Sequence, residues 1–273
     1  MNNLVALGGF SLIFVALLNG ATTSVIGNPN HSPLRVINGT TAADGEFPYM
    51  VQIMDLFNYL YCGGTIIGDK WILTSVKCST AEGIRVVYGT NELAAHKNIS
   101  TTINVTRTYQ HPLYSYKKVI IGKVPLYDVA IIELEKPIPF DANAQPIKLA
   151  DANAQVPFHK NGTLSGWGVN DKWGVKPMPS LQKINLQLLT DEECSQIINK
   201  RAYEDIWDST QNVCSNDNYS GQCRGDAGGP FVVDGVQYGV TSWSIPECGT
   251  SPGAYSRLTT PSIREFIKNV TGI

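Results

Sequence analysis

The chain has 273 residues and a formal net charge of −2. This length is enough for one large domain, or two small ones, with a hydrophobic core. The balanced charge provides no basic surface for nucleic acid and no basic run for an anionic membrane. Glycine is frequent, and short β-branched runs alternate with turn residues, which predicts an all-β protein.

Residues 1–20 are predicted to form a secretory signal peptide. Residues 4–18 are apolar, and the Asn19-Gly20-Ala21 stretch offers small residues for cleavage. A membrane anchor is the weaker interpretation, because the apolar run is too short for a bilayer core of about 30 Å. We therefore expect a secreted, extracellular protein.

Three later stretches have the pattern of β-strands. Residues 71–74, Trp-Ile-Leu-Thr, predict a buried strand. Apolar Ile184, Leu186 and Leu188 alternate with polar residues, which is the period of a half-buried strand. Residues 231–238 predict a hairpin, because Asp-Gly separates two apolar runs and favours a two-residue turn.

The carboxyl end is predicted to be an amphipathic helix. Thr260 can cap it through its hydroxyl, and Pro261 suits the first helical position. Four apolar residues then share one helical face: Ile263, Phe266, Ile267 and Val270. We expect this face to pack on the core.

Six cysteines suit an oxidising compartment: Cys62, Cys78, Cys194, Cys214, Cys223 and Cys248. The residues alone leave their pairing open. A metal site is disfavoured, because no two cysteines have Cys-x-x-Cys spacing and no histidine lies within a few residues of a cysteine. We expect disulfides and no metal or other cofactor.

Sequons of the Asn-x-Ser/Thr type predict surface glycosylation. The candidates are Asn98, Asn104, Asn161, Asn218 and Asn269, and further sequons begin at Asn30 and Asn38.

Residues 222–230 read Gln-Cys-Arg-Gly-Asp-Ala-Gly-Gly-Pro. They resemble the Gly-Asp-Ser-Gly-Gly-Pro loop of chymotrypsin-family serine proteases, with Ala227 where that family has its nucleophilic serine. Residues 71–78 resemble the family segment that ends Ala-Ala-His-Cys, with Lys77 in place of the general-base histidine.

A third segment, residues 127–132, resembles the family segment around the orienting carboxylate, which Asp128 matches. The resemblance covers residues 36–273. It implies two packed six-stranded antiparallel β-barrels, trypsin-like, with a C-terminal helix. It also implies the disulfides Cys62–Cys78, Cys194–Cys214 and Cys223–Cys248.

The triad needs a hydroxyl nucleophile, an imidazole that takes its proton, and a carboxylate that orients the imidazole. Only Asp128 remains of these three. Lys77 could act as a base only with a serine, which position 227 lacks. Two roles stay open for Lys77: a positive partner for a buried Asp128, or a side chain that extends into solvent.

Further roles follow from the resemblance. The Arg35–Val36 bond resembles the activation bond of the family's zymogens, and the Val36 ammonium freed by its cleavage is expected to pair with Asp226. The N–H groups of Gly225 and Ala227 match the oxyanion hole. The chain then divides into a signal peptide (1–20), a propeptide (21–35) and a protease-like domain (36–273).

The resemblance also identifies the specificity pocket. Gly221 matches its base, so the aspartate of trypsin-like enzymes is absent and no preference for basic side chains is implied. Ser244 stands where the pocket wall usually has glycine, and Gly253 follows a short loop. We expect a narrowed pocket.

These observations predict a monomeric, catalytically inactive protease homologue that binds extracellular proteins, with host complement or another defence cascade as first candidates. Residues 71–74 and 45–49 also resemble mite digestive proteases, the group 3 allergens, whose inactivated paralogues are associated with blocking complement, a form of immune evasion. The alternative is a weakly active or substrate-trapping serine endopeptidase. A third interpretation is a remnant without a binding role.

Overall fold

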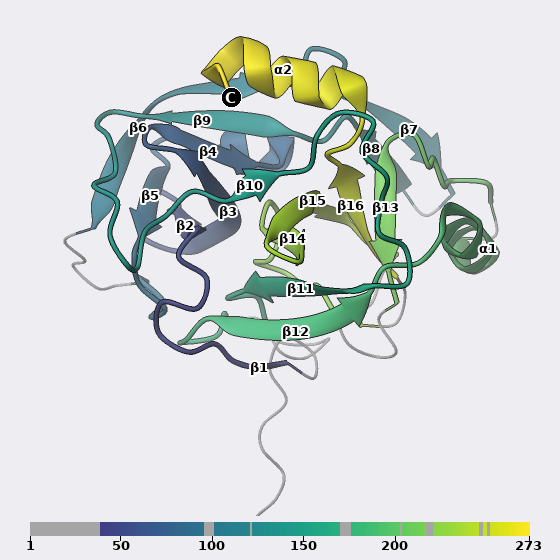
Figure 1. Cartoon of the computed structure of the whole chain (residues 1–273), viewed down its shortest axis with the longest axis horizontal. Helices are drawn as coiled ribbons and strands as arrows, with labels where there is room; N and C mark the ends of the chain where they lie inside the picture. Colours follow the sequence, from purple (N-terminus) through teal and green to yellow (C-terminus); the bar gives the residue numbers. More distant parts are fainter. Residues whose placement is uncertain are drawn as a thin grey trace, which may run out of the picture. The chain divides into compact units, whose positions relative to one another are not determined.

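Figure 1 shows the structure, a computed structural model of the chain. It describes residues 39–95, 101–120, 122–169, 176–202, 204–216, 221–245, 248–249 and 252–273. The chain divides into two units, Met1–Ser32 and Pro33–Ile273, and the described residues belong to the second. The predicted signal peptide, propeptide and Val36 lie outside the described residues. Within the described ranges, no helix is long and apolar enough to span a membrane.

The first half of the described chain forms a closed antiparallel barrel in the order β2-β3-β4-β9-β6-β5 (Figure 1). Its strands are β2 (Met50–Met54), β3 (Leu60–Gly68), β4 (Trp71–Thr74), β5 (Arg85–Tyr88), β6 (Thr102–Gln110) and β9 (Ala130–Leu134). Strand β4 coincides with the predicted buried strand, and Ile72 and Leu73 in it are fully buried. That prediction is confirmed.

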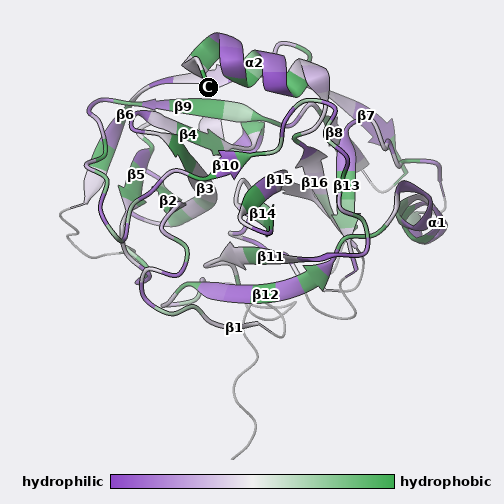
Figure 2. Ribbon diagram, in the orientation of Figure 1, coloured by the Kyte–Doolittle hydropathy of each residue, from purple (hydrophilic) through white to green (hydrophobic). Residues whose placement is uncertain are grey.

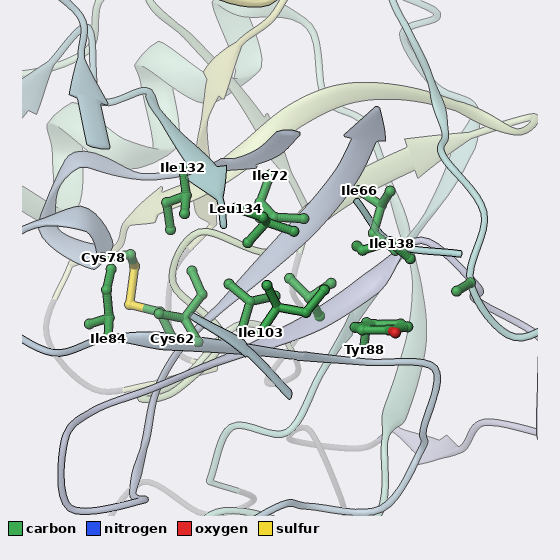
Figure 3. Packing of buried hydrophobic residues seen from close by; sticks show 14 residues of the cluster. Cys62, Ile66, Ile72, Cys78, Ile84, Tyr88, Ile103, Ile132, Leu134 and Ile138 are labelled. Atoms are coloured by element: carbon green, nitrogen blue, oxygen red, sulfur yellow. A yellow bond between two sulfur atoms is a disulfide. The ribbon is translucent and has the colours of Figure 1, made fainter. Parts of the chain in front are cut away.

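Branched aliphatic side chains fill this barrel. Figure 3 shows Ile66, Ile72 and Ile132 in one buried cluster with the Cys62–Cys78 disulfide. Isoleucine suits the pleated surface of a strand, and burying each such side chain contributes about 1.5–3 kcal/mol. The disulfide ties β3 to the short 3₁₀ helix η1 (Val76–Ser79), the segment that carries Lys77.

The second half forms a sheet in the order β1-β12-β11-β14-β15-β16-β13, with β10 added beside β15. Its strands are β1 (Thr40–Thr41), β10 (Lys148–Leu149), β11 (Asn161–Gly166), β12 (Gln182–Gln187), β13 (Asn212–Ser215), β14 (Pro230–Val233), β15 (Val236–Trp243) and β16 (Gly253–Arg257). A bridge between Leu188 and Ser215 joins the two ends of the six-stranded run from β12 to β13. The all-β fold with two six-stranded barrels is therefore confirmed.

The predicted hairpin is formed by β14 and β15, which pair antiparallel. Asp234 and Gly235 connect them with φ angles of 48° and 76°. Both angles are positive, as a tight turn that matches the strand twist requires. The half-buried strand predicted around Ile184 is β12, with Leu186 buried and Asn185 exposed.

The predicted C-terminal helix is α2 (Pro261–Thr271). Figure 2 shows hydrophobic and hydrophilic residues alternating along it, and Ile263 and Ile267 are buried on the core. One detail of the prediction is wrong. Thr260 is at the capping position, but its hydroxyl makes no capping bond, because it donates to the Thr210 carbonyl at 2.6 Å.

Two further features lie outside the predicted barrels and C-terminal helix. The hairpin of β7 (Ser115–Val119) and β8 (Gly122–Leu126) forms a separate two-stranded sheet. Helix α1 (Asp191–Ala202) begins with a capping box. The Thr190 hydroxyl accepts the Glu193 N–H at 3.2 Å, and the Glu193 carboxylate accepts the Thr190 N–H at 2.8 Å.

Candidate active-site region

Asp128 links the two barrels. It precedes β9 and is only 4% exposed. Its Oδ1 accepts the Val76 N–H of η1 at 2.8 Å, and its Oδ2 accepts the Ser242 hydroxyl of β15 at 2.5 Å. Burial raises the pKa of this carboxyl, while the bonds from Ser242 and Val76 and the charge of Lys77 act in the opposite direction.

Lys77 follows Val76 in η1, and its side chain is exposed. No hydrogen bond or ion pair joins its ammonium to a described residue. The main chain holds its position, since the Lys77 carbonyl accepts the Tyr61 hydroxyl at 3.1 Å. Of the two roles left open by the sequence, the structure therefore favours extension into solvent, with only a through-space effect on Asp128.

Backbone bonds bring Ala227 to this junction. Its carbonyl accepts the Gly63 N–H of β3 at 2.9 Å, and the next residue, Gly228, donates to the Thr241 carbonyl at 2.8 Å. Thr241 immediately precedes Ser242, the partner of Asp128. The three positions predicted from the triad motifs are thus assembled in one place. Position 227 presents a methyl group there, and position 77 an exposed ammonium.

The turn around Ala227 also leaves two N–H groups available. Gly225 and Ala227 donate to none of the described residues, whereas Asp226, Gly228 and Gly229 all donate to carbonyls. Gly225 has a φ of 99°, and a Cβ there would lie 3.0 Å from the Gly168 Cα. The oxyanion-hole role of the two N–H groups stays a prediction, with geometry that permits it.

Asp226 is completely buried. Its Oδ1 accepts the Gly168 N–H at 2.8 Å, and its Oδ2 accepts the Cys223 N–H at 2.9 Å. Burial raises the pKa of this carboxyl to about 6 despite both bonds. Its expected partner, Val36, lies outside the described residues, so the pairing stays a prediction.

The residues assigned to the specificity pocket surround a glutamine that the sequence interpretation overlooked. Gly221 and Gly253 are buried, and Ser244 is half-buried. Gln222 is 7% exposed, and its Nε2 donates to the Trp243 carbonyl at 2.6 Å. The available signal was its place between the predicted pocket base, Gly221, and Cys223.

Comparison with known proteins agrees with this arrangement. The sequence matches the Trypsin family over residues 36–267. The chain belongs to the trypsin family.

One curated relative is transmembrane protease serine 9 of Rattus norvegicus, 31% identical over 251 residues. The match covers 87% of this chain and 22% of that protein, so the chain spans about a fifth of its relative's length. Among solved structures, neuropsin, a serine protease expressed in mouse brain, has a TM-score of 0.73 at 25% identity, covering 85% of this chain and 98% of that one. Human heparin binding protein has a TM-score of 0.70 at 22% identity, covering 86% and 96%, and supports the fold alone.

The structure also locates the predicted disulfides and some of the predicted glycosylation sites of this trypsin-family domain. All three disulfides form as expected: Cys62–Cys78, Cys194–Cys214 and Cys223–Cys248. Among the described sequons, Asn104, Asn161 and Asn269 are exposed, while Asn98 and Asn218 lie outside the described residues. No cluster of metal-ligating side chains occurs in the described part of the chain.

Gly228, the residue after Ala227, is tightly packed. Its φ is 80°, and a Cβ would lie 2.0 Å from the Thr74 Oγ1 and 2.6 Å from the Gly63 carbonyl oxygen. We expect Gly228→Ala to reduce the free energy of unfolding by about 3 kcal/mol or more, because backbone strain and overpacking add. The measurement is urea denaturation.

Gly235→Ala is the matched control for this prediction. Gly235 has a similar φ of 76°, but nothing lies within 4 Å of its Cβ position. This variant should lose only about 1 kcal/mol. Equal losses for the two variants would show that the contact with Thr74 is not restrictive.

Proposed function

We propose that this trypsin-family chain is a secreted protease homologue that cleaves no peptide bonds and acts by binding extracellular proteins. The proposal rests on which side chains occupy the three positions that match the triad. Ala227 provides no hydroxyl and Lys77 no imidazole, while Asp128 is fixed by other partners. In subtilisin, a protease with the same triad on another fold, loss of the nucleophile or base costs about 2 × 10⁶ in rate, or about 8–9 kcal/mol.

The expected result is no turnover by the purified mature protein. Peptide and ester substrates should remain intact, and a fluorophosphonate probe should leave the protein unlabelled, because both readouts need the missing hydroxyl. Mass spectrometry after probe treatment, with an active trypsin in parallel, is the measurement. Stoichiometric labelling, or turnover near that of the active enzyme, would contradict the proposal.

An exposed apolar loop beside the site supports binding as the function. We define the 55–60 loop as residues 55–59, which connect β2 to β3, together with Leu60, the first residue of β3. Its Leu56, Phe57 and Tyr59 are 53%, 66% and 56% exposed. The Asp55 carboxylate accepts the N–H groups of Phe57 and Tyr59, both at 2.9 Å, which fixes the loop. Exposed apolar groups held in one conformation are typical of protein-binding surfaces.

The loop also lies close to the altered site. A Cβ on Gly225 would lie 3.4 Å from the Leu60 side chain, and the Tyr61 hydroxyl bonds to the Lys77 carbonyl. A partner that covers the 55–60 loop would thus extend over the former catalytic region without needing its chemistry. Complement or clotting-type proteins of a host remain the first candidates, and secretion through the signal peptide is part of the same proposal.

The surface model of binding is tested with purified complement components by surface plasmon resonance. Replacing Leu56, Phe57 and Tyr59 together with serine should weaken binding at least tenfold, since aromatic anchors dominate such interfaces. A control, Phe140→Ser, changes another exposed apolar residue, 42% exposed. The cleft-filling Ser244→Trp should leave binding intact.

The alternative is a substrate-trapping decoy. It would be indicated if Ser244→Trp abolished binding while the triple serine variant bound normally. A protein that bound no component in any form would fit the remnant interpretation. The relation to mite proteases stays a prediction from the sequence.

A further inference from the structure

Gln222 lies among the residues that form the specificity pocket in trypsin-family proteins. It follows the buried Gly221, whose φ is 129°, and precedes Cys223 of the Cys223–Cys248 disulfide. Glutamine is mostly exposed in proteins. Here more than nine-tenths of the residue is buried, so its amide is directed into the protein and not along the surface.

The amide touches the other two segments assigned to the pocket. Its Nε2 donates to the Trp243 carbonyl at the end of β15, at 2.6 Å. A Cβ on Gly253, at the start of β16, would lie 3.1 Å from the Gln222 Cδ and 3.2 Å from its Oε1. The Gln222 side chain therefore contacts β15 through Trp243 and packs against the backbone of Gly253 in β16, where a larger residue would crowd it.

Only one end of the Gln222 amide has a hydrogen-bond partner among the described residues. The Gln222 Oε1 is buried and accepts no hydrogen bond from a described residue. The Tyr255 hydroxyl lies near the same Gly253 position and is 2.8 Å from the Ser215 hydroxyl. A carbonyl oxygen left without a donor is unfavourable. The side chain is held there by its bond to Trp243 and by packing.

We propose that Gln222 is a built-in plug that occupies the specificity pocket, so that the cleft admits no substrate side chain whatever the state of the triad. Removing the side chain should expose a site for a flat aromatic ligand with an N–H donor, such as indole or benzamide. That donor would replace the amide on the Trp243 carbonyl. The inference concerns the pocket alone and does not rest on the proposed absence of catalysis.

The test is isothermal titration calorimetry of indole and of benzamide with whole-chain variants. Wild-type protein should show no binding at millimolar ligand, and Gln222→Ala should bind at least one of the two ligands at least tenfold more tightly. Gln222→Met keeps the volume of the plug and should stay closed. If Gln222→Ala does not fold, as judged by circular dichroism, Gln222→Ser serves as the open variant.

A matched control separates this pocket from any cavity left by a buried glutamine. Gln237 is fully buried, donates from Nε2 to the Gly239 carbonyl at 3.0 Å, and also has an Oε1 without a partner among the described residues. Gln237→Ala should bind neither ligand. The proposal is overturned if wild type or Gln222→Met binds as tightly as Gln222→Ala, if Gln237→Ala binds equally well, or if neither folded open variant binds. None of these outcomes bears on turnover, so they are distinct from a failure of the proposed function.

Discussion

Replacing Ala227 with serine alone is expected to leave the protein inert toward peptide substrates. A serine hydroxyl needs a base within hydrogen-bond reach. Lys77 is exposed and bonds to neither Asp128 nor any other described residue through its side chain, so no base is oriented toward position 227. Turnover of fluorogenic peptides should stay at background.

Peptide cleavage should return only when several substitutions are combined. Ala227→Ser with Lys77→His should recover only weak activity, because Gln222 still crosses the pocket. Adding Gln222→Ser should raise kcat/KM at least tenfold further, because the pocket would then admit a substrate side chain. The same double variant carrying Gln237→Ser should gain nothing.

Two results would contradict these expectations. Full activity of the single serine variant would show that Lys77 is a working base. A triple variant no faster than the double variant, with an intact fold, would show that the pocket does not limit activity.

Cleavage of the Arg35–Val36 bond is expected to stabilise the domain by about 3 kcal/mol at pH 7 and by much less at pH 4. Asp226 carries this effect, since its pKa is raised by burial to about 6. A shift of about two units from its ordinary value corresponds to about 3 kcal/mol. A Val36 ammonium beside the carboxylate would remove that penalty.

The sign follows from proton binding. A carboxyl with a raised pKa binds its proton more tightly in the folded state, so its ionisation destabilises the uncleaved protein. The penalty is absent below pH 4, grows between pH 4 and 6, and is complete above pH 6. The uncleavable Arg35→Gln chain should therefore lose stability over that window relative to the cleaved protein.

The measurement is urea denaturation of both forms at pH 4, 5, 6 and 7, with hydrogen exchange of residues 221–229 at pH 7. Exchange should be faster in the Arg35→Gln chain. The control is Asp226→Asn, which cannot titrate and should abolish the pH dependence of the difference. Identical stability and protection of the two forms at every pH would mean that the switch is vestigial.

The sequence supports the fold and the triad positions because both depend on local patterns. The Asp-Gly turn and the apolar β4 stretch each predict an element that the structure contains, whereas the disulfide pairing is implied only by the family resemblance. Helix α1 was missed although Thr190 and Glu193 form a capping box, because the surrounding residues are mostly polar and carry little apolar periodicity.

The sequence predicts where a residue stands in the chain better than it predicts which residues its side chain contacts. A motif identifies Gln222 as a neighbour of Cys223, but only the folded chain brings it against Trp243 and Gly253. In the same way, the partners of Asp128 come from segments 52 and 114 residues away, so the sequence could not show that they satisfy it without Lys77.

The hydrogen bonds of Asp128 give a reason for this residue to be retained in a protein that is no longer selected for peptide cleavage. A substitution of Asp128 would leave the Val76 N–H and the Ser242 hydroxyl without their shared acceptor inside the junction. Such a loss lowers stability, which selection maintains in any folded protein. By contrast, the Ala227 methyl only packs against the core of the first barrel, and the exposed Lys77 ammonium bonds to no described residue. An aspartate at this position is therefore a poor diagnostic of activity among relatives, and the residue pair at 77 and 227 is the informative character.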